Sequence, residues 1–228
     1  MMTIRYCIAV LLLFCFLVSC SKSSDPEPEG KIRVACIGNS ITYGAILTNR
    51  DKNSYPAVLN RLLGDAYHVG NFGVNGAAAL STASKPYMQE DAYLEALDYR
   101  PDVVIIKLGT NDCISFHWTN KNDYKKDMMA LVASFQALPS NPLIYLCYPV
   151  KYYYNEERDN VIVTEIIPVI DEIVEEQDLM AIDLHTATEN MPEHFPDNLH
   201  PNEAGTRIIA ETVYAALSTF FRMFAETY

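Results

Sequence analysis

The sequence predicts a three-layer α/β/α sandwich built on a parallel five-stranded sheet. Five short apolar runs alternate with longer segments of helical periodicity between residues 32 and 225. Most of the apolar runs are continuous rather than alternating, which is typical of parallel strands covered on both faces. Strand–helix alternation of this kind forms one sheet with helices on both sides. We find neither an internal repeat nor a composition break that would mark a second domain.

The predicted strands are residues 32–38, 68–73, 103–109, 143–148 and 180–184. The predicted helices are residues 54–64, 91–100, 123–138, 163–177 and 201–225. Gly64 ends the first helix, and prolines at 101 and 139 follow the second and third. Pro168 lies inside the fourth pattern, so we expect that helix to start or kink near it.

Residues 1–30 are expected to lie outside the fold. Arg5 precedes the apolar stretch 8–18, which at about 1.5 Å per residue is too short to cross a hydrocarbon core of about 30 Å. This stretch therefore indicates a signal peptide over 1–19. The ending "LVSC" resembles the lipobox of bacterial lipoproteins, with an ordinary signal peptide as the alternative. We predict lipidation of Cys20, a flexible tether over 20–30, a folded domain over 31–228 and a location in the bacterial cell envelope.

Composition excludes several classes of protein. The formal net charge of −12 disfavours nucleic-acid binding, which needs clustered Lys and Arg. Beyond Cys20 the chain has three cysteines (Cys36, Cys113 and Cys147), an odd number without C-x-x-C spacing. This pattern predicts neither a disulfide framework nor a zinc site. We expect no metal, no cofactor and a monomer that meets the membrane only through its lipid anchor.

Polar loops follow the predicted strands at the edge where parallel sheets bind ligands. "GNSITYG" follows the first strand, "GVNGAA" the second and "GTNDC" the third, and "FPDNLHPN" precedes the last helix. The first loop lacks the lysine of a phosphate-binding loop and is not the G-x-S-x-G elbow. Taken alone, it fits a turn with a helix cap as well as it fits a nucleophile.

Asp197 and His200 are three residues apart, so the carboxylate can bond one imidazole nitrogen and leave the other to accept a hydroxyl proton. Gly73 can offer a backbone N–H and Asn111 a side-chain amide to a developing oxyanion. Each has a structural alternative, because solvated Asp–His pairs, strand-ending glycines and Asx-turns are common. Asp183, at the end of the fifth strand, is a rival for the orienting acid.

Ser40 in "GNSIT", Gly73 in "NFGVNG", Asn111 in "GTND" and His200 in "DNLHPN" together resemble the four blocks of the SGNH/GDSL hydrolase family, in the same order. The resemblance extends over 32–225 and implies a flavodoxin-like fold with strand order 2-1-3-4-5. It implies Ser40 as nucleophile, His200 as general base and Asp197 as orienting acid. It also implies an oxyanion hole of the Ser40 and Gly73 N–H groups and the Asn111 amide. Asn39 departs from the family, whose motif has aspartate there.

The expected activity is that of a serine esterase, a carboxylic ester hydrolase that acts through an acyl-enzyme. The "GNSITYG" form with a lipoprotein tether is similar to carbohydrate O-acetylesterases, so we expect short acyl esters, mainly acetyl, on small molecules or polysaccharides. A lysophospholipase or thioesterase and a non-catalytic carbohydrate-binding lipoprotein are the alternatives. Trp118 and Asn39 are candidate substrate contacts, although aromatic side chains after the third and fourth strands can equally pack loops onto the sheet.

Overall fold

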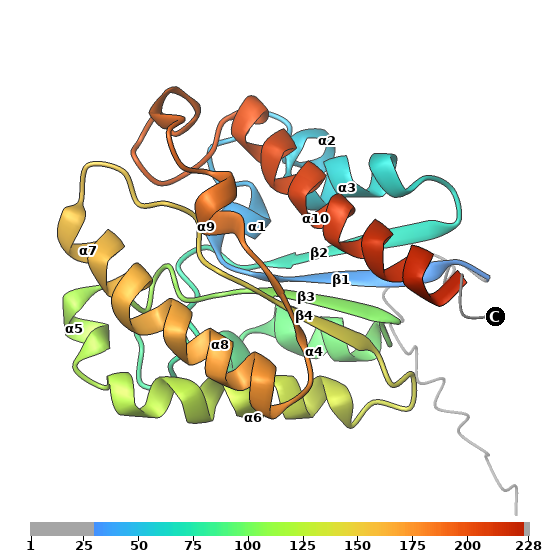
Figure 1. The fold of residues 1–228 in the computed structure, drawn as a ribbon, viewed down its shortest axis with the longest axis horizontal. Coiled ribbons are helices and arrows are strands. Elements are labelled where there is room, and N and C mark those ends of the chain that lie inside the picture. The colour runs from blue at the N-terminus through green and yellow to red at the C-terminus, as the bar shows by residue number, and fades with distance from the viewer. Residues whose placement is uncertain (1–29, 226–228) are drawn as a thin grey trace, which may run out of the picture.

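A five-stranded sheet forms the centre of the computed structural model, which describes residues 30–225 (Figure 1). The strand order is β2-β1-β3-β4-β5, and every neighbouring pair is parallel. The strands are β1 Ile32–Gly38, β2 Tyr67–Gly73, β3 Val103–Lys107, β4 Leu143–Cys147 and β5 Met180–Ile182. The predicted fold class and strand order are therefore confirmed, with the third, fourth and fifth strands ending slightly earlier than expected.

Helices cover both faces of the sheet (Figure 1). One face carries α1 Ser40–Tyr43, α2 Arg50–Asn53, α3 Tyr55–Leu63, α9 Leu184–Ala187 and α10 Glu203–Ala225. The other carries α4 Asp91–Asp98, α5 Ser115–Trp118, α6 Tyr124–Gln136, α7 Glu156–Val161 and α8 Ile167–Glu176. Short 3₁₀ turns lie at Tyr87–Gln89, Lys121–Asp123 and Pro192–His194.

Two apolar cores form because successive side chains of a strand point to opposite faces. Val34 and Cys36 of β1 join the core under α3 and α10, whereas Ala35 and Ile37 join the core under α4, α6 and α8. All four side chains are fully buried. The continuous apolar run of β1 therefore reflects a central strand that is covered on both faces.

The predicted helix over 163–177 starts earlier in the structure, at Glu156. A π-helical turn at Ile162–Ile166 joins α7 to α8 and immediately precedes Pro168. Proline has no N–H to donate back along the helix, and a widened turn accommodates that loss. The irregularity expected near Pro168 is thus present, but the helix continues through it.

The predicted signal peptide over 1–19, the lipidated Cys20 and almost all of the tether lie outside the described residues. Among residues 30–225, no helix is both long and apolar enough to cross a membrane.

Candidate active site

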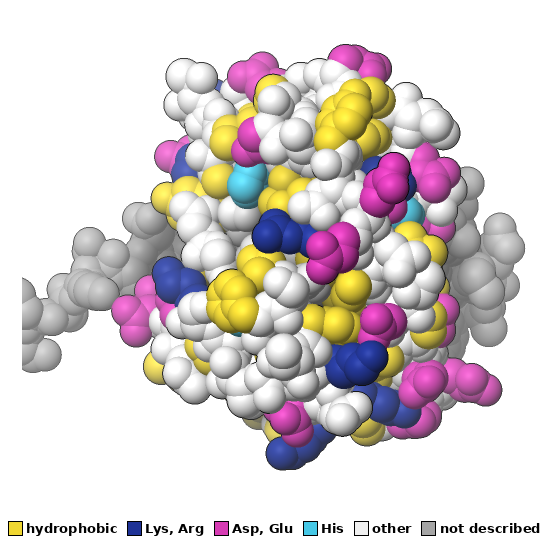
Figure 2. All heavy atoms as spheres, turned by 90° about the vertical axis from the view of Figure 1, so that its left-hand side faces the viewer, with side chains coloured by type: hydrophobic (Ala, Val, Ile, Leu, Met, Phe, Trp, Pro, Cys, Tyr) yellow, Lys and Arg dark blue, Asp and Glu magenta, His cyan; other side chains and the backbone are white. Residues whose placement is uncertain are grey.

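The loops after β1, β2 and β3 start side by side at the carboxyl edge of the sheet. In the sheet register Gly38 of β1 is paired with Gly73 of β2 and with Lys107 of β3. Figure 2 looks onto this edge, where hydrophobic side chains are interspersed with histidine and charged side chains. The residues singled out from the sequence are therefore carried by neighbouring loops at the edge where parallel sheets bind ligands.

Ser40 is the first residue of α1, directly after β1. The Asn39 side chain caps this short helix, since its Oδ1 accepts a hydrogen bond from the Ile41 N–H at 3.1 Å. Gly38 leaves no room for a side chain, because a Cβ there would lie 2.1 Å from Thr42 Oγ1. Ser40 keeps 8% exposure while its neighbours Asn39 and Thr42 have none, so the serine retains some access to solvent beside two fully buried residues.

Asp197 and His200 bond to each other and to Ser40. His200 Nδ1 lies 2.7 Å from Asp197 Oδ2, and His200 Nε2 lies 2.7 Å from Ser40 Oγ. Because a carboxylate only accepts, Nδ1 carries the proton and Nε2 is free to accept from the serine hydroxyl. Asp197 Oδ1 also accepts the backbone N–H groups of Leu199 at 3.1 Å and His200 at 2.6 Å. The backbone of the loop thus orients the carboxylate toward the imidazole.

Asp197 is held in its ionised form by these bonds. Partial burial raises the pKa of Asp197, but the hydrogen bonds from the His200 N–H, the His200 imidazole and the Leu199 N–H outweigh it and leave the pKa below its usual value. The rival acid Asp183 lies elsewhere: its Oδ1 accepts from the Thr186 N–H at 2.8 Å and caps α9. The structure therefore brings Ser40, His200 and Asp197 together and leaves Asp183 apart from them.

The expected oxyanion donors are partly occupied by other hydrogen bonds. The Gly73 N–H donates to Asn71 Oδ1 at 3.0 Å, an Asx-turn, and Asn111 Nδ2 donates to the Ala77 carbonyl at 2.8 Å. Asn111 keeps a second amide hydrogen, and the Ser40 N–H belongs to the first turn of α1, which has no carbonyl partner within the helix. Two of the three expected donors are therefore available, and the third is shared with a side chain.

Gly73 also sets how close β2 comes to α1. A Cβ on Gly73 would lie 2.2 Å from the Tyr43 nitrogen and 2.7 Å from the Thr42 carbonyl carbon. Backbone atoms cannot yield as a flexible side chain can, so only glycine fits at this position. The strand-ending glycine seen in the sequence is thus required by the approach of two backbones.

His117 and Asp112 fix the loop that contains Asn111. His117 Nδ1 lies 2.8 Å from the Asn111 carbonyl, and the Ser84 N–H donates to His117 Nε2 at 3.1 Å. A backbone carbonyl on one side and a backbone N–H on the other require the neutral Nδ1–H tautomer. The Asp112 carboxylate accepts three backbone N–H groups, those of Ala79, Leu80 and Gly109. His117 was not singled out from the sequence, because nothing in its spacing links it to position 84.

The prediction that Asn39 contacts the substrate is wrong. Its side chain is fully buried, and its Oδ1 accepts from the Ile41 N–H and from Lys107 Nζ, the latter at 3.3 Å. Its Nδ2 has no hydrogen-bond partner within the described part of the chain. The Asn39 side chain therefore lies buried beneath the Ser40 loop and does not face a substrate.

The prediction that Trp118 contacts the substrate is also wrong. It is only 8% exposed, its Nε1 donates to Glu165 Oε2 at 3.0 Å, and its ring lies edge-on to Tyr124 with centroids 5.4 Å apart. The alternative reading of this segment, aromatic side chains packing a loop onto the sheet, describes Trp118 better. Phe116 on α5 and Tyr154 in the loop after β4 are the exposed aromatic residues of these segments, at 63% and 80%.

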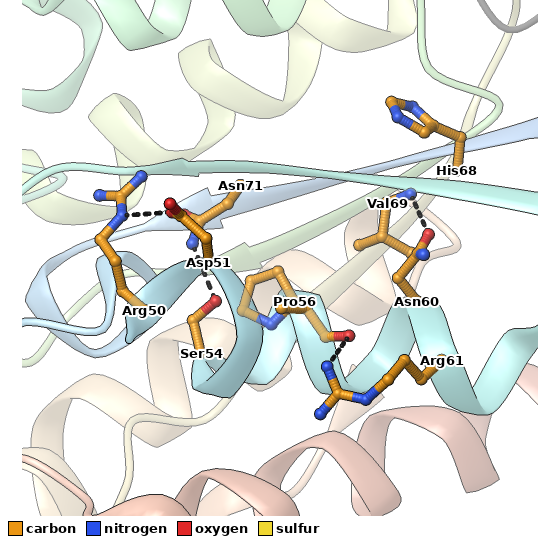
Figure 3. A pocket seen from close by; sticks show the side chains of 10 residues that line it. Arg50, Asp51, Ser54, Pro56, Asn60, Arg61, His68, Val69 and Asn71 are labelled. Atoms are coloured by element: carbon orange, nitrogen blue, oxygen red, sulfur yellow. Dashed lines mark hydrogen bonds and ion pairs between the residues drawn. The ribbon is translucent and has the colours of Figure 1, made fainter. Parts of the chain in front are cut away.

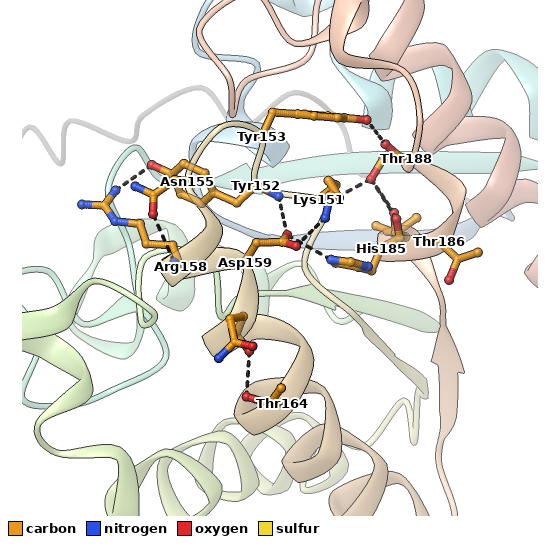
Figure 4. A network of polar contacts seen from close by, with 12 residues as sticks. Lys151, Tyr152, Tyr153, Asn155, Arg158, Asp159, Thr164, His185, Thr186 and Thr188 are labelled. Carbon is orange, nitrogen blue, oxygen red and sulfur yellow. Dashed lines mark hydrogen bonds and ion pairs between the residues drawn. The ribbon is translucent and has the colours of Figure 1, made fainter.

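A second polar cluster ties the loop after β4 to α7 and α9 (Figure 4). Asp159 pairs with Lys151 Nζ, accepts the Tyr152 N–H at 2.9 Å and lies 3.2 Å from His185 Nε2. Burial raises the pKa of Asp159, but Lys151, Tyr152 and His185 outweigh it and hold the pKa below its usual value. These contacts lie inside the cluster, which indicates a structural role for His185.

The pocket in Figure 3, of about 400 Å³, lies between α2, α3 and the edge strand β2. Its lining consists of Arg50, Asp51, Ser54, Pro56, Ala57, Asn60, Arg61, His68, Val69 and Asn71. Neither Ser40 nor His200 contributes to it. Arg61 donates to the Lys52 carbonyl of α2 and the Ala57 carbonyl of α3, and Asn60 accepts from the Val69 N–H of β2, so these side chains serve the packing of α3 against α2 and β2. Within residues 30–225 no group of three or more His, Cys, Asp or Glu side chains is placed to hold a metal ion.

Comparison with known proteins gives one relative of similar sequence. An acetylxylan esterase from Xylanibacter ruminicola is 38% identical over 216 residues, which cover 86% of this chain and 45% of the relative. The chain thus spans less than half the length of that protein.

Solved structures share the fold at lower identity. A carbohydrate acetylesterase family member from Sinorhizobium meliloti superposes with a TM-score of 0.64 at 18% identity, covering 82% of this chain and 97% of that one. A two-domain esterase active on acetylated mannans, co-crystallised with mannopentaose, gives 0.62 at 20% identity, covering 84% of this chain and 51% of that one. Residues 36–208, which contain Ser40, Gly73, Asn111 and the Asp197–His200 pair, match the family described as GDSL-like lipase/acylhydrolase. With its sheet order, its four loops and this match in agreement, the chain belongs to the GDSL-like lipase/acylhydrolase family.

Proposed function

We propose that this protein is a serine esterase that removes short acyl groups, acetyl above all, from carbohydrate. The observation that carries the proposal is the hydrogen-bonded series from Ser40 Oγ through His200 to Asp197, with 2.7 Å at both links. A serine hydroxyl is a weak nucleophile unless a neighbouring base takes its proton, and His200 Nε2 is placed to do so. Asp197 fixes the tautomer that makes this possible.

The chemistry follows from these atoms. Ser40 Oγ attacks the ester carbonyl carbon while its proton passes to His200 Nε2, and the carbonyl electron pair moves onto oxygen. Collapse of this intermediate reforms the carbonyl and breaks the ester C–O bond, and the departing alcohol takes the proton from His200. Water then attacks the acyl-enzyme and gives a proton to His200, which returns it to Ser40 as the carboxylic acid leaves.

The oxyanion in this scheme is bonded by the Ser40 N–H, the free hydrogen of the Asn111 amide and the Gly73 N–H. Gly73 contributes when its N–H turns from Asn71 Oδ1 to the oxyanion, which is the stronger acceptor because it carries a full charge. Such donors act most strongly when they are fixed in advance, and His117 and Asp112 fix the Asn111 loop.

The substrate class rests on the relatives. The similar chain is an acetylxylan esterase, and the structural neighbours include a carbohydrate acetylesterase and an esterase active on acetylated mannans. The test is acetate release from acetylated xylan and acetylated mannan by the wild type and by Ser40→Ala. Release by the wild type alone supports the proposal, whereas equal release by both proteins contradicts the role of Ser40.

Nitrophenyl esters of increasing acyl length separate this proposal from a lysophospholipase or thioesterase. We expect the rate to be highest for acetate, and a preference for acyl chains of about eight carbons or more would contradict the acetyl assignment. If Ser40→Ala leaves every hydrolytic rate unchanged while the protein still binds polysaccharide, the non-catalytic alternative holds instead.

We further propose that Cys20 carries a lipid that anchors the protein to the bacterial cell envelope. The support is the apolar stretch 8–18 ending in "LVSC", followed by a polar segment rich in Ser, Pro and Glu. Mass spectrometry of the mature N-terminus tests this proposal. An unlipidated N-terminus, or detergent partitioning that Cys20→Ala does not change, would contradict it.

A further inference from the structure

Lys107 is a fully buried lysine at the end of β3, close to the nucleophile loop. Val103 and Ile105 belong to the core under α3 and α10, and the two-residue period of a strand directs Lys107 to that same face. A lysine is rarely buried without a carboxylate, because its charge loses the stabilisation of water. Packing alone therefore does not explain a buried lysine at this position.

The ammonium group joins two loops of the candidate site. Lys107 Nζ donates to Asn39 Oδ1 at 3.3 Å and to Thr110 Oγ1 at 3.4 Å. Asn39 immediately precedes Ser40, and Thr110 immediately precedes Asn111. One buried side chain therefore links the loop of the proposed nucleophile to the loop of a proposed oxyanion donor.

The titratable groups that face Lys107 are neutral. Cys147 on β4, Cys36 on β1 and Tyr55 on α3 share its core, and burial raises the pKa of all three, that of Cys147 to about 12. Asp112, five residues after Lys107, uses its oxygens on backbone N–H groups, and Asp102, five residues before it, pairs with Arg33. Across the described residues no carboxylate pairs with Lys107, and burial lowers its pKa to about 7.

Asn39 is the residue that leaves this charge without a counter-ion. An aspartate at position 39, as in the family motif, would place a carboxylate against Lys107 Nζ and neutralise it. The asparagine offers only its Oδ1, which accepts from both Lys107 and the Ile41 N–H, while its buried Nδ2 has no partner in the described chain. The departure at Asn39 and the buried Lys107 are thus two parts of one arrangement.

We propose that Lys107 is a positioning residue for ester hydrolysis, and that its positive charge, left without a counter-ion by Asn39, holds the Ser40 and Asn111 loops together and favours the oxyanion between them. This inference rests on the proposed esterase function. A charged donor makes bonds roughly twice as strong as a neutral one, and a fixed cation in a poorly solvated site stabilises negative charge that develops nearby. When Lys107 loses its proton, both effects weaken and hydrolysis slows.

The test measures kcat and KM on 4-nitrophenyl acetate between about pH 5 and pH 10 for the wild type, Lys107→Met, Asn39→Asp and a control. We expect the wild-type kcat to fall on the alkaline side. Lys107→Met should lower kcat about tenfold with little change in KM and should lose that alkaline fall. Asn39→Asp should move the fall up by about one pH unit or more, because a carboxylate favours the charged lysine.

The control is Lys125→Met, which removes an exposed lysine paired with Glu172 and Glu176 and should leave the profile unchanged. A Lys107→Met variant with wild-type kcat and the same alkaline fall would overturn the inference. So would an Asn39→Asp variant whose profile matches the wild type. If Lys107→Met fails to fold, as judged by circular dichroism, the Asn39→Asp profile decides alone.

Lysine carbon-13 NMR separates this inference from the proposed function. In Ser40→Ala protein one lysine Cε signal, identified by its absence in Lys107→Met, should titrate near neutral pH. The Asn39→Asp substitution should raise the pH at which this signal titrates. If wild type and Ser40→Ala hydrolyse esters equally, the esterase proposal fails and the role of Lys107 in hydrolysis fails with it, whatever the NMR shows. If the wild type is active and the Lys107 variants follow its profile, only the present inference fails.

Discussion

Asp197→Asn offers the sharpest test of the proposed mechanism, because the loop dictates how the new amide must lie. Asp197 Oδ1 accepts two backbone N–H groups, from Leu199 and His200. An asparagine keeps both bonds only if its carbonyl oxygen occupies that place, which leaves its NH₂ group facing His200 Nδ1. Nδ1 must then accept, and the imidazole proton moves to Nε2.

A proton on Nε2 removes the acceptor for the Ser40 hydroxyl, which lies 2.7 Å away in the wild type. Loss of the general base in its correct tautomer costs about 10⁴-fold in kcat, or roughly 5 kcal/mol of barrier. Since the backbone bonds persist, the thermal midpoint should change by only a few degrees. The assay is kcat and KM on 4-nitrophenyl acetate, with the thermal midpoint measured on the same samples.

Asp183→Asn is the matched control, since it makes the same chemical change at the rival acid. Asparagine is as good a helix cap as aspartate, so position 183 should still accept the Thr186 N–H at the start of α9, and the activity should stay within about twofold. The reasoning is refuted if Asp197→Asn keeps more than about a tenth of wild-type kcat, or if Asp183→Asn loses as much activity.

Three further predictions concern the backbone and the buried lysine. Gly73→Ala should lower kcat/KM at least about tenfold and lower the thermal midpoint, because its Cβ would lie 2.2 Å from the Tyr43 nitrogen; activity equal to wild type would mean that α1 can move freely. His117→Ala should lower kcat about tenfold with little change in KM, because the Asn111 carbonyl loses its donor; steady-state kinetics decide this, and a change confined to KM would contradict it. The free energy of unfolding of Lys107→Met minus that of the wild type should be roughly 5 kcal/mol larger below pH 7 than near pH 10.5. The pKa of Lys107 is lowered from 10.5 to about 7 on folding, so across that window the unfolded wild-type chain binds a proton that the folded protein does not. Urea unfolding of both proteins at about pH 6 and about pH 10 measures this, and a stability difference that does not vary with pH would contradict it.

The sheet could be predicted because its central strands β1, β3 and β4 are buried on both faces. Runs such as 32–38 and 103–107 are apolar without interruption apart from Arg33 and Lys107, and that pattern leaves few alternatives to parallel strands. The hydrogen bond between Asp197 and His200 could also be predicted from the sequence, since it joins residues three apart in one loop. Short-range contacts leave their mark in the spacing of the residues.

Contacts between residues far apart in the sequence could not be predicted from their spacing. Lys107 lay within the predicted strand 103–109 and was counted as part of it, and only the sheet register shows that it lies beside the loop of Asn39. His117 bonds Ser84 from 33 positions away. Trp118 was expected near a substrate because of its place after β3, yet the side on which a short helix packs is decided by partners such as Glu165. Spacing alone carries no information on these partners.

The position of Ser40 itself follows from packing rather than from helix propensity. A helix of four residues has no stability of its own in water, so α1 exists because its neighbours enforce it. Gly38 and Gly73 let β1 and β2 approach to within contact of Thr42 and Tyr43, where a Cβ on either glycine would overlap. Ser40, the proposed nucleophile, is therefore fixed by the close approach of two glycines and by one buried cap, Asn39. Substitutions at these positions should lower activity well before they unfold the protein, since reaction rates respond to displacements far smaller than those that disrupt a core.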